Sequence, residues 1–225
     1  MSSNMHYSLL DGSVITVRHR NGETSTTNLP EIFCVLLDDS IVSFKTLQPH
    51  QQQAWYSFLV QLAAMAVARE NDGKIPTTPN EWKKLLVNLA DGSEAAWHLV
   101  VDDVSKPAFM QPPIPESSLK EAKYRSDIQT PDELDMLVTS KNHDIKGNRI
   151  LRPDPEHWFF ALLTLQTMEG FLGRGNYGIV RMNGGFGNRP LVGLSPEKSW
   201  GKRFLRDVIV LLKNRTFLMD LYTPN

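Results

Sequence analysis

The spacing of apolar residues along the chain predicts several helices. Apolar side chains recur at three- and four-residue intervals through residues 49–69, so they share one helix face. Shorter stretches of the same kind predict helices at 81–89, 155–171 and 199–213. Thr130-Pro131-Asp132-Glu133 has the proline and acids that favour the first turn of another helix. These faces form a core, and no chemistry is assigned to them.

The N-terminal residues follow a different pattern. Residues 7–18 alternate around Asp11-Gly12, which predicts a β-hairpin, and Asn21-Gly22 predicts a second turn. The apolar segment 32–37 fits either a strand or a short helix. Together the elements predict an α+β fold: a mixed, irregular domain with an N-terminal β-hairpin, several helices and a glycine-rich hairpin.

Length and composition are consistent with a single domain over residues 1–225. Of these residues, 41% are apolar, which is enough for a substantial core. A sub-boundary is expected near 102–130, where prolines break regular structure. The N-terminus has no signal-peptide core, and the longest apolar run, 62–68, is too short to cross a bilayer. We therefore expect a cytoplasmic protein that does not bind membranes.

Charge is distributed unevenly along the chain. Residues 1–140 carry 11 Lys and Arg against 18 Asp and Glu, whereas residues 141–225 carry 13 against 7. A basic segment on an acidic chain is a candidate contact surface for a polyanion. A solvated surface whose charges happen to segregate explains the same numbers, so charge alone leaves both interpretations open.

The residue types that perform catalysis are scattered. Cys34, the only cysteine, lies in an apolar stretch that suits a buried structural thiol better than a nucleophile. The histidines form no His-x-x-x-His pair, so a zinc site is not expected. Asp38-Asp39 and Asp102-Asp103 are better explained as solvated turn residues than as metal ligands. We expect no enzyme activity, no metal and no cofactor.

The most distinctive segment is rich in glycine. Eight of the 14 glycines lie within residues 170–193, interleaved with arginines. Residues 173–178 match the G-x-G-x-x-G pattern of dinucleotide-binding proteins, but a helix is expected before them and a strand after them, the reverse of what that site needs. Extension to Val180 matches the kinase glycine loop, yet no catalytic or metal-binding Asp motif follows.

The remaining interpretation is a glycine-rich hairpin whose tip presents backbone groups between arginines. Such a tip can enter a nucleic-acid groove because few side chains obstruct it. A tight hairpin that only packs against its neighbours is the structural alternative. The predicted DNA-binding residues are Arg174, Arg181, Asn183, Gly184, Gly185, Phe186, Gly187, Asn188 and Arg189.

Four stretches together resemble the N-terminal part of the CasA-type large subunit of Cascade, the type I-E CRISPR surveillance complex. Asn28-Leu29-Pro30-Glu31-Ile32, which leads to the helix at 49–69, is similar to the family's opening. Pro107-Ala108-Phe109-Met110-Gln111 is similar to its Pro-Phe-Met-Gln segment. Residues 139–149 and 183–190 correspond to a loop near the guide RNA and to the family's glycine loop. The order and spacing of the four stretches carry the resemblance.

The resemblance implies a non-catalytic, RNA-guided role. The glycine loop would contact the protospacer-adjacent-motif duplex, and a loop containing Lys141, Asn142, His143 and Lys146 would lie near RNA and neighbouring subunits. The implied partners are CRISPR RNA, double-stranded target DNA, the other Cascade subunits and the helicase-nuclease that the complex recruits. Family members are longer, so the chain is expected to be a fragment, a truncated form or a minimal variant.

Two other hypotheses remain open from the residues alone. A small enzyme acting on a nucleotide or phosphorylated metabolite would use the glycines and arginines to hold phosphate. A structural adaptor would use the glycine turn only for packing.

Overall fold

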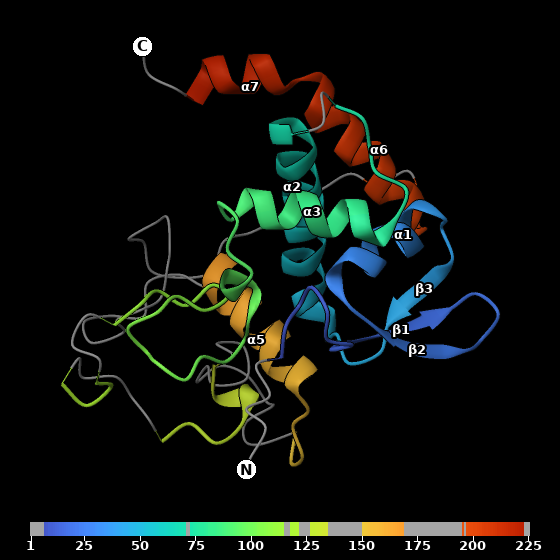
Figure 1. Ribbon diagram of the computed structural model, residues 1–225. Coiled ribbons are helices and arrows are strands. Elements are labelled where there is room, and N and C mark those ends of the chain that lie inside the picture. The colour runs from blue at the N-terminus through green and yellow to red at the C-terminus, as the bar shows by residue number, and fades with distance from the viewer. Residues whose placement is uncertain are drawn as a thin grey trace. The chain divides into compact units, whose positions relative to one another are not determined.

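The computed structural model describes residues 7–70, 73–114, 118–121, 127–134, 150–168, 195 and 197–222 (Figure 1). The chain forms two compact units, each assembled from three stretches. The sheet unit comprises residues 15–45, 56–94 and 193–225. The α5 unit comprises residues 1–14, 46–55 and 95–192, and contains helix α5 (Pro155–Thr167). The expected α+β class is confirmed by the elements below.

The sheet unit contains a three-stranded antiparallel sheet. Its strands are β1 (Ile15–His19), β2 (Thr24–Thr27) and β3 (Ile41–Phe44), in the order β2-β1-β3 (Figure 1). Ile15 pairs with Thr27 across the first hairpin. Val17 of β1 pairs with Phe44 of β3 on the other side of the central strand. Strand β3 was not predicted from the sequence.

The N-terminal hairpin exists, but its turn is Asn21-Gly22 rather than Asp11-Gly12. Gly22 has a φ of +91°, a conformation that glycine adopts without steric cost. Asp11-Gly12 belongs to a separate turn closed by a hydrogen bond from Gly12 N to Ser8 O of 2.8 Å. Ser8 itself pairs with His98 instead of β1. The predicted hairpin over 7–18 is therefore wrong, because residues 7–10 find their backbone partners elsewhere in the chain.

Helix α1 (Leu29–Leu37) resolves the choice that the segment 32–37 left open. Asn28 caps its first turn, because the side chain of Asn28 accepts from Glu31 N at 3.0 Å. The Glu31 carboxylate accepts in return from Asn28 N at 3.2 Å. This capping box satisfies two backbone donors that a helix start would otherwise leave unpaired. The local sequence therefore favours a helix at this point.

Three helices of the sheet unit pack around one aromatic side chain. The Phe33 ring of α1 lies 4.4 Å from that of Trp82 in α3 (Pro79–Leu89) and 5.8 Å from that of Phe204 in α6 (Trp200–Lys213). All three rings are almost fully buried. Burial of a large apolar side chain contributes about 1.5–3 kcal/mol, so this cluster accounts for much of the packing between the helices. The helices at 81–89 and 199–213 are confirmed.

Helix α2 (Gln52–Glu70) follows a 3-10 turn, η1 (Pro49–Gln51), and confirms the strongest prediction from periodicity. The final helix, α7 (Arg215–Tyr222), was not predicted. Its apolar residues Phe217, Met219 and Leu221 are more than half exposed. They alternate along the chain and do not form the regular apolar helix face from which the other helices were predicted. In the described part of the chain, no helix combines the length and the apolar character that a bilayer crossing requires.

The α5 unit is organised around helix α5. The Trp55 ring lies 5.4 Å from that of Phe159 and 5.5 Å from that of Phe160, both edge-on. Two 3-10 turns, η2 (Ala95–Trp97) and η3 (Pro131–Leu134), belong to the same unit. The predicted helix at 155–171 is confirmed as far as Thr167, and residues 169–171 lie outside the described residues. The proline-containing stretch 102–114 is irregular but carries the buried Phe109 and Ile114.

Gly201 allows α6 to approach α1 closely. A Cβ atom on Gly201 would lie 2.2 Å from the carbonyl oxygen of Leu36 and 2.7 Å from the Cα of Asp39. Both contacts are with backbone, which cannot rotate away as a flexible side chain can. The sequence alone gave no reason to expect a glycine in the first turn of this helix.

We expect Gly201→Ala to destabilise the protein by about 1–3 kcal/mol, the usual cost of an overpacked contact. Alanine is favoured over glycine in a helix by about 1 kcal/mol, but the backbone clash outweighs that gain. Chemical denaturation checks the change. Lys202→Ala, at the exposed neighbouring position, is the control and should change stability by less than about 0.5 kcal/mol. Equal stability of wild type and Gly201→Ala would contradict the close approach.

Candidate nucleic-acid interface

The residues predicted to contact nucleic acid lie outside the described residues. This applies to both predicted sets, which remain predictions. The DNA-binding set is Arg174, Arg181, Asn183, Gly184, Gly185, Phe186, Gly187, Asn188 and Arg189, and the RNA-facing set is Lys141, Asn142, His143 and Lys146. The structure does describe the points at which these segments join the fold.

Helix α5 carries both junctions in the α5 unit. The segment 135–149 is followed by Ile150, which lies shortly before α5. The segment 169–194 begins directly after Met168, the C-cap residue of α5. Thirteen residues at 1.5 Å per residue make α5 about 20 Å long. Because Phe159, Phe160 and Leu163 are buried, the helix is a rigid spacer that joins the two segments at its opposite ends.

The start of α5 is fixed by hydrogen bonds. Ile150 N donates to the carboxylate Oδ2 of the buried Asp132 at 2.8 Å, which ties the returning chain to η3. Asp154 N donates to His157 Nδ1 at 3.1 Å in the first turn. The chain that leaves 135–149 is therefore held at two points before the helix begins.

The end of α5 is supported by the Pro107–Gln111 stretch. The Phe109 ring lies 5.8 Å from that of Phe159, and the side-chain amide of Gln166 donates to Met110 O at 2.8 Å. Met110 adopts a φ of +53°, which is unusual for a residue other than glycine. One of the stretches that carries the family resemblance thus positions the helix end from which the glycine-rich segment departs.

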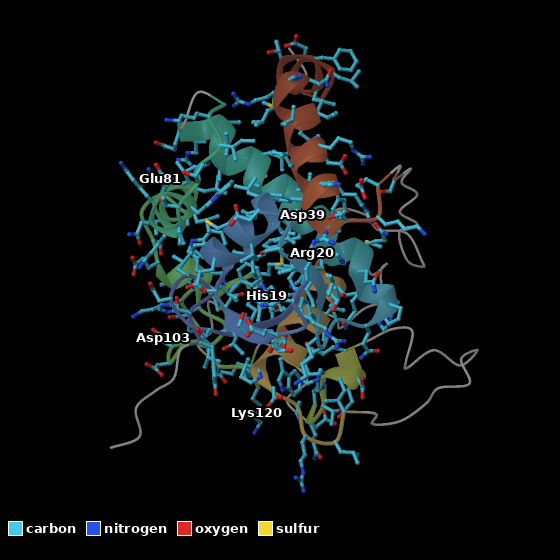
Figure 2. The ribbon with its side chains drawn as sticks, turned by 90° about the vertical axis from the view of Figure 1, so that its right-hand side faces the viewer. His19, Arg20, Asp39, Glu81, Asp103 and Lys120 are labelled. Atoms are coloured by element: carbon cyan, nitrogen blue, oxygen red, sulfur yellow. The ribbon has the colours of Figure 1, made fainter. Side chains whose placement is uncertain are left out.

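The glycine-rich segment rejoins described structure at α6, where a polar cluster holds the helix start (Figure 2). Arg20 donates from its guanidinium to Asp39 Oδ2 at 2.8 Å, to Asp39 O at 2.5 Å and to Ser199 Oγ at 2.9 Å. The Ser199 hydroxyl in turn donates to Asp39 Oδ1. Ser199 occupies the N-cap position but makes no side-chain cap bond to the helix, because its hydroxyl is used by Asp39.

An aromatic contact supplements this cluster. The Trp200 ring at the start of α6 meets Phe44 of β3 edge-on at 5.0 Å and lies 6.0 Å from the ring of Tyr56. Such aromatic pairs contribute about 0.5–1.5 kcal/mol beyond the area they bury. The first residue of α6 is therefore held by both polar and apolar contacts.

The pKa of Asp39 reflects its position in the cluster. Partial burial alone would raise the pKa of this carboxyl group, but hydrogen bonds from Ser199 and Arg20 and the charge of Arg20 lower it, and the net pKa lies below the usual value. Asp39 therefore stays ionised at neutral pH, and its ion pair with Arg20 persists there.

The exposed face of α6 is basic. Lys202, Arg206 and Lys213 lie on the side of the helix opposite the buried Phe204 and Val208. Lys202 is 65% exposed and lies 3.8 Å from Glu197, and Arg206 pairs with Asp207 at 2.6 Å. We use the name α6 basic face for the exposed cations Lys202 and Lys213 of α6 together with Arg215, the first residue of α7.

Another cation of α6 has a structural role. The Arg203 guanidinium stacks 4.2 Å from the centre of the Tyr56 ring, and the Tyr56 hydroxyl donates to Asp207. Burial and the Asp207 carboxylate raise the pKa of Tyr56, so its phenol stays protonated and continues to donate. Arg203 thus packs α6 against α2. It is not part of the α6 basic face.

Sequence reasoning missed the α6 basic face. The helix was recognised from its apolar positions, and its cations were counted only in the charge of residues 141–225. The spacing of 202, 206 and 213 relative to 204 and 208 was available as a signal, since residues on opposite sides of a helix can be read from a 3.6-residue period. Their exposure and partners required the structure.

The described part of the chain offers neither a reactive thiol nor a cluster of metal ligands. Cys34 is half-buried rather than buried, and its thiol donates to Thr77 O at 3.7 Å. Burial, followed by the charges of Asp38, Glu31 and Glu81, raises the pKa of Cys34 to about 11, so the thiol is protonated at neutral pH. Within the described ranges, no three His, Cys, Asp or Glu side chains gather as metal ligands would.

We expect Asp39→Asn to remove a pH-dependent part of the stability. A carboxylate whose folded pKa is lowered stabilises the fold fully above its unfolded pKa, about 3.9, and loses that contribution as the pH falls through the folded value. The gap in melting temperature between wild type and variant should therefore be widest near neutral pH and close in acid. Asn tolerates the positive φ of +50° at this position, so the backbone is not an added variable. A gap that does not change with pH would contradict the ionised cluster.

Comparisons of the chain with protein-family models, with curated protein sequences and with solved structures found no significant match.

Proposed function

We propose that this chain is a non-catalytic subunit of a CRISPR RNA-guided DNA surveillance complex of the Cascade type, which contacts the protospacer-adjacent-motif duplex through its glycine-rich segment. The observation that carries the proposal is the continuity of residues 170–193, rich in glycine and arginine, with a helix whose exposed side is basic. The family resemblance of four ordered stretches supports it. The partners are CRISPR RNA, target DNA, the other subunits and a recruited helicase-nuclease.

In the proposed contact, the backbone of the glycine-rich tip enters the groove and basic side chains bind phosphates. A tip containing Gly184, Gly185 and Gly187 presents backbone groups to a groove without side-chain bulk. The α6 basic face, which follows the segment in the chain, contacts phosphates and positions the tip without reading sequence. Minor-groove recognition separates mainly A·T from G·C pairs, so the subunit would accept several short motifs and leave sequence reading to the guide RNA.

Anchoring on both sides suits this role. A loop that enters a groove must bear against rigid structure, since a freely moving loop loses binding free energy when it is ordered. Gln166 and Met110 hold the chain where the segment begins, and Ser199, Asp39 and Arg20 hold it where the segment ends. The same supports would serve a packing role, so the experiments below test nucleic acid directly.

Replacement of Gly184 and Gly185 by Leu should abolish motif-dependent binding of duplex DNA by the assembled complex, because the added side chains fill the space that the groove walls need. Electrophoretic mobility shift with matched and motif-free duplexes measures the effect. Gln61→Leu, at an exposed position of α2, is the control, because it adds the same side chain without straining the backbone. Unchanged motif-dependent binding by the Gly184/Gly185 variant would reject the loop assignment and favour the adaptor hypothesis.

Replacement of Lys202, Lys213 and Arg215 by Ala should weaken duplex binding across all sequences and reduce the salt dependence. Each lost phosphate contact lowers the slope of log affinity against log salt by roughly 0.9. A control triple, Lys45→Ala, Lys74→Ala and Lys84→Ala, removes the same charge from exposed positions outside α6. Equal slopes for the two triples would show that only total charge matters and that the α6 basic face makes no specific contact.

A further inference from the structure

The α5 unit contains an apolar cavity that the proposed function does not use. The cavity has a volume of about 550 Å³, within the range of about 300–1,000 Å³ that is usual for ligand sites. Its lining comes from four separate stretches of the chain. Residues that line it include Tyr7, Leu99, Leu134, Pro155, Trp158 and Leu162.

The lining is suited to an apolar occupant. Among the described residues that line the cavity, Gln111 alone has an amide side chain, and its amide nitrogen already donates to Leu99 O at 3.0 Å and to Phe109 O at 3.4 Å. Trp158 is half-buried at the cavity, so part of a large aromatic surface faces it. With so few polar groups, the cavity cannot compensate a polar ligand for the water it would lose.

The stretches that line the cavity are acidic. Asp102 and Asp103 follow Val100, Asp127 precedes Ile128, and Asp154 lies between two lining prolines, Pro153 and Pro155. These four carboxylates are exposed. Residues 99–111, 127–134 and 150–162 together carry seven carboxylates and two Lys or Arg side chains, Lys106 and Arg152. Local charge of this sign repels a polyanion and attracts cations.

Asp103 is held in its charged form. Asp103 is labelled in Figure 2. Its carboxylate accepts from Ser105 Oγ at 2.6 Å and from Ser105 N at 2.9 Å, and these hydrogen bonds lower the pKa of Asp103. The negative charge at this position therefore persists below neutral pH. Nucleic acid is disfavoured at this surface, in contrast to the α6 basic face.

We propose that this cavity is a docking site for a partner protein, and that the occupant is an apolar side chain of a peptide segment flanked by lysine or arginine. The apolar side chain enters the cavity, and the flanking cations lie against Asp102, Asp127 and Asp154. Charge complementarity excludes an acidic segment, and the apolar lining excludes a purely basic one. The inference stands apart from the proposed nucleic-acid role, because the residues concerned belong to neither predicted contact segment.

The test uses three fluorescein-labelled nonapeptides and the full-length protein. The first carries Leu-Phe between lysines, the second carries Leu-Phe between glutamates, and the third carries Ser-Ser between lysines. Fluorescence anisotropy should show saturable binding of the first peptide. Loss of the apolar pair should weaken binding at least about tenfold, and the reversed charges should do the same at low salt. Absence of saturable binding by the first peptide, or equal binding of all three, would overturn the proposal.

Matched variants locate the site. Val100→Arg places a cation at the lining and should abolish binding, whereas Val42→Arg, on strand β3 of the sheet unit, is the control, since the two valines are 47% and 44% exposed. Asp102→Asn with Asp154→Asn should weaken binding about 2- to 20-fold at low salt, and Asn retains the ability of residue 154 to cap α5. Equal loss in Val100→Arg and Val42→Arg would place the peptide elsewhere and reject the cavity.

Failure of this test is distinguishable from failure of the proposed function. Val100→Arg should leave duplex binding by the assembled complex unchanged, and the α6 triple variant should leave peptide binding unchanged. If an unlabelled DNA duplex displaced the peptide from the wild-type protein, the cavity would be a nucleic-acid contact and the proposal of a protein partner would be wrong.

Discussion

The close approach of α6 to α1 at Gly201 is the constraint on which the sheet unit depends. Only a residue without a Cβ leaves room for the carbonyl oxygen of Leu36, and that closeness brings Ser199 within reach of Asp39. Arg20 then joins both residues, so the start of α6 is tied to the residue that follows β1 and to the turn that follows α1. The start of α6 takes its position from this junction.

Local chemistry explains which parts of the fold could be predicted. The Asn28–Glu31 capping box and the regular apolar spacing of 52–70 act over a few residues, so the helices follow from nearby sequence. The prediction of a hairpin around Asp11-Gly12 was wrong because a turn sequence does not specify which strands pair. Ser8 pairs with His98, 90 positions away. Helix α7 lacks the buried stripe from which a helix is recognised.

The candidate sites depend on contacts that sequence patterns do not contain. Arg20 and Ser199 are 179 residues apart, and the cavity of the α5 unit draws its lining from residues between Tyr7 and Leu162. No short-range rule brings such residues together. The glycine-rich segment is the opposite case, because its composition is visible directly in the sequence. Sequence therefore indicated a contact segment, whereas the structure supplied its anchors and the second, acidic surface.

The two proposed contact surfaces carry opposite charge, and on the proposed function this difference has a consequence. A subunit of a ribonucleoprotein must hold a polyanion at one place and protein at another without exchange between them. The cations Lys202, Lys213 and Arg215 would favour phosphate, whereas Asp102, Asp127 and Asp154 would repel it around the mainly apolar cavity. Charge at each surface thus works by exclusion as well as by attraction. On the two proposals, a chain with a formal net charge of only −1 would discriminate between two classes of macromolecule through the placement of its charges.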